Sequence, residues 1–129
     1  MSEPIHILII DDMPEIRKIL RLLLERKLNA DIIEADSGLT GVEEFVRYKP
    51  DLVFCDLNMP EMTGLECLGF MTRQSHAEEC RFVVLTTADD EETQVQVEDL
   101  SIQAFLRKPF DAANIEEKLR KLIPENYFL

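Results

Sequence analysis

The sequence predicts an α/β fold in which helices cover both faces of a parallel five-stranded sheet. Short apolar runs rich in β-branched residues alternate along the chain with longer segments whose apolar residues recur at helical spacing. Residues that favour helix starts stand near the beginning of the longer segments. Because each strand is followed by a helix, neighbouring strands are joined by crossover connections, and such units form parallel sheets with helices on both faces.

Apolar runs place the five strands along the chain. The strands are expected near residues 6–11, 31–35, 51–56, 81–87 and 103–107. The segments between them are long enough for one helix each, as parallel pairing requires.

The first two helices are marked by their start residues and by their apolar faces. Pro14 suits the first position of a helix, where a missing N–H costs nothing. Ser37 is placed to cap the second helix. The expected apolar faces comprise Ile16, Ile19, Leu20 and Leu23 in the first helix, and Val42, Phe45 and Val46 in the second.

The remaining helices begin at capping signals. Thr63-x-x-Glu66 has the spacing of a capping box, and Asp89-x-x-Glu92 is its Asp equivalent. Asp111 is placed to cap the fifth helix, and Pro124 ends it. The acids from Asp89 to Glu92 are interpreted as residues that favour a helix N-terminus, and not as a docking patch.

Composition limits the classes of function. With 129 residues, 46% of them hydrophobic, the chain is expected to form one domain over residues 1–129. No window approaches the roughly 20 apolar residues of a membrane span, and the first residues lack the basic start of a secretory signal, so a cytoplasmic protein without membrane contact is expected. The net charge of -12 disfavours direct binding of nucleic acid, because phosphate contacts need clustered Lys and Arg. The three cysteines form no C-x-x-C pair and are interpreted as buried thiols, while His6 and His76 belong to no kinase motif and are interpreted as surface residues.

Carboxylates stand at the ends of two apolar runs. Asp11 and Asp12 follow the first run, and Asp56 closes the third. A single Asp in such a place is ordinarily a solvated turn residue. Two further coincidences favour a functional site, because Thr87 and Lys108 stand at the ends of the fourth and fifth runs.

Carboxylates gathered at one place favour a hard divalent cation. Neighbouring carboxylates raise one another's pKa, and a cation removes that conflict. Mg²⁺ prefers oxygen ligands and keeps several waters, which suits a few carboxylates together with a phosphate oxygen. Lys108 adds a fixed positive charge, and Thr87 offers a hydroxyl donor. Such a pocket suits a phosphoryl group and leaves Asp56 free to attack phosphorus in line.

These motifs together resemble the receiver domain of two-component response regulators, of the chemotaxis-regulator type. The matching segments are Ile10-Asp11-Asp12, Asp56-Leu57-Asn58-Met59-Pro60 followed by Gly64, Thr87-Ala88, and Phe105-Leu106-Arg107-Lys108-Pro109-Phe110. The resemblance extends from about Ile7 to Ile123. It implies a flavodoxin-like sheet with strand order 2-1-3-4-5, in which ligands bind where the order reverses, between the first and third strands.

The resemblance implies a role for each residue of the site. Asp56 would accept a phosphoryl group from a phosphohistidine on a sensor histidine kinase or a phosphotransfer protein. Asp12 would bind Mg²⁺ directly and Asp11 mainly through a bound water, with Asp56 and the backbone carbonyl of Asn58 as further ligands. Lys108 would pair with the phosphoryl group, and the peptide bond that follows it would be cis.

The resemblance also implies how the signal would leave the site. Thr87 would move toward the phosphoryl group, and the ring of Phe105 would turn into the space that it leaves. The face formed by the fourth helix, the fifth strand and the fifth helix would then contact a downstream protein target, and homodimerisation through the same face on phosphorylation is left open. Candidate contact residues on that face are Val95, Val97, Phe105 and Arg107.

Some residues of this chain depart from the family pattern, and others occupy positions that affect the lifetime of the phosphoryl group in the family. Ser101 and Ile102 stand where Gly-Ala is usual, and Phe105 replaces the commoner tyrosine. In the family, the positions of Asn58 and Asp89 tune hydrolysis of the phosphoryl group, and these two residues imply a short-lived one.

Two other classes of function remain. Phosphatases that form a phosphoaspartate also use a strand-end Asp with Mg²⁺, but they place a second Asp two residues later as general acid, where this chain has Asn58. An interaction module that works without phosphorylation usually lacks the acids or the lysine of this site, whereas this chain retains them. The sequence therefore predicts a switch that assists its own phosphoryl transfer and is not an enzyme acting on other substrates.

Overall fold

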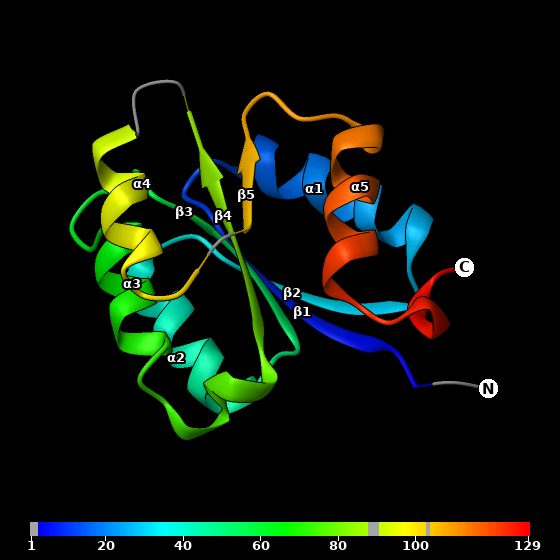
Figure 1. The fold of residues 1–129 in the computed structure, drawn as a ribbon, viewed down its shortest axis with the longest axis horizontal. Coiled ribbons are helices and arrows are strands. Elements are labelled where there is room, and N and C mark those ends of the chain that lie inside the picture. Colours follow the sequence, from blue (N-terminus) through cyan, green and yellow to red (C-terminus); the bar gives the residue numbers. More distant parts are fainter. Residues whose placement is uncertain (1–2, 88–90, 103) are drawn as a thin grey trace.

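Five parallel strands form the centre of the molecule (Figure 1). The structure is a computed structural model, and it describes residues 3–87, 91–102 and 104–129. The strands are β1 (Ile5–Ile10), β2 (Ala30–Ala35), β3 (Leu52–Asp56), β4 (Arg81–Thr86) and β5 (Ala104–Arg107). Their order in the sheet is β2-β1-β3-β4-β5, with every neighbouring pair parallel, which confirms the predicted order 2-1-3-4-5.

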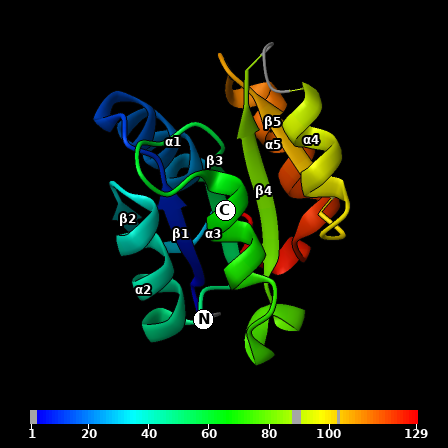
Figure 2. The same cartoon turned by 90° about the vertical axis from the view of Figure 1, so that its left-hand side faces the viewer.

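Five α-helices cover the two faces of this sheet. They are α1 (Pro14–Lys27), α2 (Gly38–Tyr48), α3 (Gly64–Met71), α4 (Glu91–Glu98) and α5 (Ala112–Leu122), with short 3-10 helices at Ser75–Glu79 and Glu125–Tyr127. Helices α1 and α5 lie on one face, and α2, α3 and α4 lie on the other (Figures 1 and 2). Within the described ranges, no helix combines the length and apolar character needed to cross a membrane.

Several predicted caps are present. The Ser37 hydroxyl accepts a hydrogen bond from the backbone N–H of Thr40 at 3.2 Å, and Thr63 forms a complete capping box with Glu66. The Asp111 carboxylate likewise accepts from a backbone N–H in the first turn of α5. The predicted cap at Asp89 lies outside the described residues.

Side chains of the central strands are buried on both faces of the sheet. In β1, Ile7 and Ile9 belong to the core under α1 and α5, whereas Leu8 and Ile10 belong to the core under α2, α3 and α4. All four are fully buried. This double burial explains why the strands read in the sequence as continuous apolar runs and not as alternating ones.

The residues with which α1 and α2 face the sheet differ in part from the predicted apolar faces. Ile19 is 47% exposed and Val46 is 44% exposed, so the predicted inward positions of these two residues are wrong. The predicted burial of Leu20 in α1 and of Phe45 in α2 is confirmed, and α1 also buries Leu24. The apolar stripe of a helix is wider than the part of the helix that contacts the sheet, so apolar residues at the margin of the stripe remain exposed to solvent.

Both histidines, predicted to lie at the surface, are only partly exposed: 43% of the His6 side chain is exposed, and His76 is half-buried. His6 is half-buried and its ring lies edge-on to Tyr48. His76 stacks on the ring of Phe45 with centroids 4.5 Å apart. Its Nε2 is buried and has no hydrogen-bond partner within the part of the chain that the structure describes.

Candidate functional site

The predicted acids meet at the carboxyl ends of β1 and β3. Ile10 pairs with Cys55 in the ladder between these strands, so Asp11 and Asp56 follow at neighbouring positions of the same sheet edge. One carboxylate oxygen from each of Asp11, Asp12 and Asp56 lies within 4.8 Å of the other two. The sequence prediction that these three carboxylates cluster is therefore confirmed.

Lys108 reaches this cluster from the loop after β5. Its Nζ lies 2.8 Å from Oδ2 of Asp11 and 3.1 Å from Oδ1 of Asp56, and only 14% of its side chain is exposed. The backbone N–H of Lys108 donates to the carbonyl of Thr86 at 2.7 Å, which continues the β4–β5 ladder up to the site. The Lys108–Pro109 peptide bond is cis, as the resemblance implied.

Burial and charge change the titration of this group of side chains. Asp56 is 3% exposed, and burial together with the charge of Asp11 raises the pKa of Asp56 to about 6, although Lys108 opposes the shift. Burial alone would lower the pKa of Lys108, but its hydrogen bond and charge interaction with Asp11 and the charge of Asp56 raise that pKa overall. The lysine is therefore held charged between two carboxylates, and one of these carboxylates binds protons more readily than an ordinary Asp.

Asp11 also accepts hydrogen bonds from Met13, just before α1, and from Arg17 of α1. It is fully buried, and its Oδ1 accepts a hydrogen bond from the backbone N–H of Met13 at 2.9 Å. The guanidinium of Arg17 donates to the backbone carbonyl of Asp11 at 2.8 Å and to Glu34 at 2.9 Å. Sequence reasoning missed Arg17, because nothing in its spacing distinguishes it from an ordinary polar residue on the first helix.

Gly64 explains how α3 approaches the end of β3. Its N–H donates to the carbonyl of Leu57 at 3.0 Å. A Cβ at this position would lie 2.0 Å from the backbone oxygen of Asp56, so no side chain is tolerated there. The glycine thus allows the backbone of α3 to pack directly against the segment that carries Asp56.

The other predicted site residues lie at the same edge or close to it. Thr87 directly follows β4 and is half-buried. The exposed residue Asn58 follows Asp56 by two positions, and a hydrogen bond from its backbone N–H opposes the rise in the Asp56 pKa. Phe105 lies in β5 opposite Val84 and packs at the margin of the core under α2, α3 and α4. The switching movement of Thr87 and Phe105 and the metal contact of the Asn58 carbonyl remain predictions.

The predicted contact residues of the α4–β5–α5 face divide into two groups. Val95 is 61% exposed, and Arg107 is also exposed. Val97 is fully buried in the core under α2, α3 and α4, so its predicted role as a surface contact is wrong. The alternation of these two valines on α4 shows that one points into the core and the other into solvent.

The thiols lie in the core, as predicted. All three cysteines are buried and free of disulfide bonds. A hydrogen bond with the Cys67 thiol and burial raise the pKa of the Cys55 thiol. Cys55 therefore stays protonated beside Asp56 and contributes packing and not charge to the site.

The donor set fits a hard divalent cation. Three carboxylates from two adjoining strand ends offer oxygen atoms at one point, and Asp11 and Asp56 are held in place by burial. Oxygen ligands of this kind, with room left for water, are what Mg²⁺ prefers over softer metals. With the lysine ammonium beside them, they also form a place for a group that carries several negatively charged oxygens.

Comparison with known proteins agrees with this geometry. The response regulator receiver domain family matches residues 7–120 of the chain. The transcriptional regulatory protein BtsR of Escherichia coli K12 is 32% identical over 122 residues, which cover 94% of this chain and 49% of BtsR. The chemotaxis protein CheY-3 of Vibrio cholerae is 29% identical over 95% of this chain and 94% of its own length. The chain thus spans about half the length of BtsR and nearly all of CheY-3.

Solved structures share the fold. The chemotaxis protein CheY4 of Vibrio cholerae superposes with a TM-score of 0.84 at 23% identity, covering 93% of this chain and 99% of that one. The receiver domain of AraT from Geobacillus stearothermophilus superposes with a TM-score of 0.80 at 28% identity, covering 91% of each chain. The acid cluster, the lysine beside it, the strand order and these matches lead to one conclusion: the chain belongs to the response regulator receiver domain family of two-component systems.

Proposed function

We propose that this receiver is a switch that is activated when Asp56 accepts a phosphoryl group. The donor would be a phosphohistidine on a sensor histidine kinase or on a phosphotransfer protein. The observation that carries the proposal is the convergence of the three carboxylates with Lys108, whose Nζ contacts both Asp11 and Asp56. Single members of this set are common on protein surfaces, whereas the convergence of two buried carboxylates, Asp11 and Asp56, with the partly buried Asp12 and Lys108 supports phosphoryl chemistry.

The chain's own residues supply positioning and charge for this transfer. Near neutral pH a carboxyl group with a pKa of about 6 is mainly ionised, so Asp56 is available as the nucleophile. One of its oxygens forms the new bond to phosphorus while the bond between phosphorus and the donor's imidazole nitrogen breaks, and the electron pair of that bond stays on the imidazole. Lys108 stands beside Asp56 and offsets negative charge on the transferred oxygens.

The acids also define where a metal would bind. Asp12 and Asp56 with the backbone carbonyl of Asn58 would hold Mg²⁺, and Asp11 would act mainly through a bound water. When bound, Mg²⁺ would reduce repulsion between the carboxylates and the phosphoryl oxygens. The three carboxylate oxygens within 4.8 Å support this assignment.

Switching would follow from a redistribution of the contacts of Lys108. Without phosphate, this ammonium divides its contacts between Asp11 and Asp56. A phosphoryl group on Asp56 adds up to two negative charges there, which favours any arrangement that brings Lys108 and the Thr87 hydroxyl closer to it. Only such a difference in contacts between two arrangements can shift their populations. Phe105, in the strand next to the one that precedes Thr87, is the residue we expect to respond.

The response would be read on the face of α4, β5 and α5. Val95 and Arg107 are exposed there and Phe105 is half-buried, so these side chains are available to a downstream protein target. A second copy of the chain is the alternative occupant of this face. We place the switch in the cytoplasm, since three free thiols suit a reducing compartment.

Acetyl phosphate or phosphoramidate with Mg²⁺ tests the proposal without a kinase. Intact-mass measurement should show one added phosphoryl group per chain and none in Asp56→Asn. Asp36→Asn is the matched control, because Asp36 is an exposed carboxylate just after β2 at the same edge of the sheet. Labelling that persists in Asp56→Asn would contradict the assignment of the acceptor. Release of many equivalents of phosphate from external esters would make the chain a phosphatase instead.

A further inference from the structure

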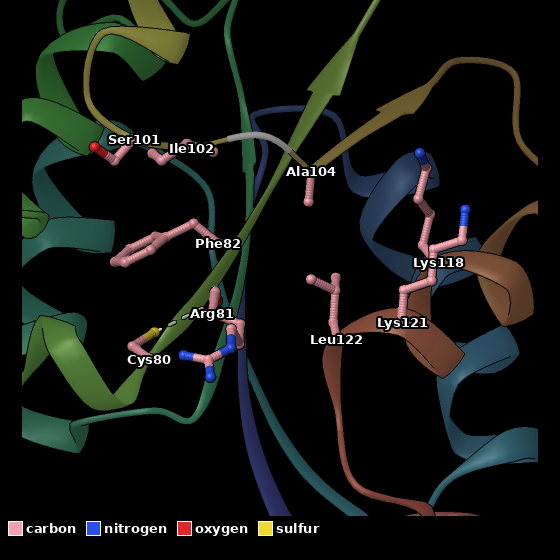
Figure 3. Close-up of a pocket in the computed structure, with 9 residues that line it drawn as sticks. All are labelled: Cys80, Arg81, Phe82, Ser101, Ile102, Ala104, Lys118, Lys121 and Leu122. Atoms are coloured by element: carbon pink, nitrogen blue, oxygen red, sulfur yellow. Dashed lines mark hydrogen bonds between the residues drawn. The ribbon is translucent and has the colours of Figure 1, made fainter.

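A cleft opens at the end of the sheet opposite the acid cluster (Figure 3). It lies where β4 and β5 begin and where α5 ends, and its volume is about 430 Å³. Ala104 and Leu122 face each other across it, and Phe82 lies on the side toward α4 (Figure 3). We call it the β4–β5 cleft. Its volume is in the range of sites that take a few side chains or a small ligand.

The charge around the cleft is opposite to that of the whole chain. The net charge of the protein is -12, yet Arg81, Lys118 and Lys121 all line this one cleft. In the described part of the chain, neither Arg81 nor Lys118 has an ion pair with a carboxylate. Lys121 has one exposed contact with Glu117 at 3.5 Å, and an ion pair of that kind is easily exchanged for another.

We propose that the β4–β5 cleft binds a segment of a partner protein in which an apolar side chain is flanked by carboxylates. The apolar side chain would lie between Ala104 and Leu122. The carboxylates would reach Lys118 and Lys121 on α5 and Arg81 at the start of β4. An acidic segment is favoured because the cations line the cleft, while the rest of the protein would repel such a segment.

This surface is separate from the phosphorylation site. The acids follow the carboxyl ends of β1 and β3, whereas the cleft lies at the amino ends of β4 and β5. Binding in the cleft can therefore be measured on the unphosphorylated chain. The variant Asp56→Asn, which cannot be phosphorylated under that proposal, should bind the same segment with unchanged affinity.

Selection from a displayed library of random twelve-residue peptides on the full chain tests the inference. The selected peptides should combine Asp or Glu with Leu, Ile, Val or Phe. Synthetic copies, followed by fluorescence anisotropy, should bind Arg81→Glu and Lys118→Glu at least tenfold more weakly than the unchanged chain. Lys18→Glu is the matched control, because it makes the same change of charge at an exposed lysine of α1 and should alter affinity less than twofold.

A substitution that fills the cleft tests the contribution of its shape separately from the contribution of its charge. Ala104→Leu keeps every charge and should weaken binding of the same peptides at least tenfold, with thermal unfolding confirming that the variant is folded. Selected peptides without carboxylates, or affinities that all three cleft variants leave unchanged, would overturn the proposal. So would self-association of the unchanged chain that Lys118→Glu abolishes in analytical ultracentrifugation, because a second copy would then be the occupant.

Discussion

Ionisation of Asp56 is expected to reduce the stability of the metal-free protein. Burial and the charge of Asp11 raise the pKa of Asp56 from 3.8 to about 6. By proton linkage, a carboxyl group whose pKa is raised in the folded state makes the folded protein less stable as the pH rises through that range. The loss of folding stability is therefore small near pH 4 and complete above about pH 7. At about 1.4 kcal/mol per pKa unit, this shift corresponds to about 3 kcal/mol at pH 8, and roughly half of that is already present at pH 5.

The substitution Asp56→Asn removes this cost. Lys108 keeps its contact with Asp11 at 2.8 Å, so the variant leaves no buried lysine without a partner. We expect urea unfolding in the presence of EDTA to show the variant about 1 to 3 kcal/mol more stable than the unchanged chain at pH 8. The advantage should shrink by about 1.5 kcal/mol at pH 5.

The exposed Asp36 provides the control for this comparison. Asp36→Asn should leave the free energy of unfolding within about 0.5 kcal/mol at both pH values. An advantage of Asp56→Asn that is equal at pH 5 and pH 8, or a variant that is less stable at pH 8, would refute the reasoning from burial and charge.

Three further changes test other parts of the site. Asp12→Asn should weaken Mg²⁺ binding at least tenfold in calorimetric titration while the metal-free stability stays within about 0.5 kcal/mol, and unchanged affinity would exclude Asp12 as a ligand. Lys108→Ala leaves the fully buried Asp11 without its cation and should cost about 3 to 5 kcal/mol in urea unfolding at pH 8, whereas a loss below about 1 kcal/mol would show that the ion pair is not buried in solution. Gly64→Ala should cost about 2 kcal/mol or more in thermal unfolding, because its Cβ would lie 2.0 Å from a backbone oxygen. Gly69→Ala, where the nearest atom would be 3.9 Å away, should be neutral or stabilising, and equal effects of the two would contradict the proposed close approach.

The edge of the sheet that carries the site could be predicted from the sequence. Continuous apolar runs gave strands that are buried on both faces, and parallel strands present their carboxyl ends at one edge. Asp11 and Asp56 had to meet once the strand order was known, because β1 and β3 are neighbours, whereas Lys108 follows β5 and reaches the two acids past β4. That order came from the resemblance, since periodicity alone does not specify which parallel strands are neighbours.

Features that depend on packing around the helices could not be predicted in this way. Helical spacing identified an apolar stripe but not its limits, so Ile19 and Val46 were expected to be buried and Val97 was expected to be exposed. The contact of Arg17 with the Asp11 carbonyl depends on how α1 packs above the site. The stacking of His76 on Phe45 joins segments far apart in the chain, and no local pattern signals it.

Locating the phosphoryl group tests the central claim most directly. The full chain would be treated with phosphoramidate and Mg²⁺, digested at low pH and analysed by tandem mass spectrometry. The account predicts a single modified site, at Asp56, which disappears when EDTA replaces Mg²⁺. A phosphoryl group found on His6, His76 or any other side chain, or equal modification of Asp56 without metal, would contradict it.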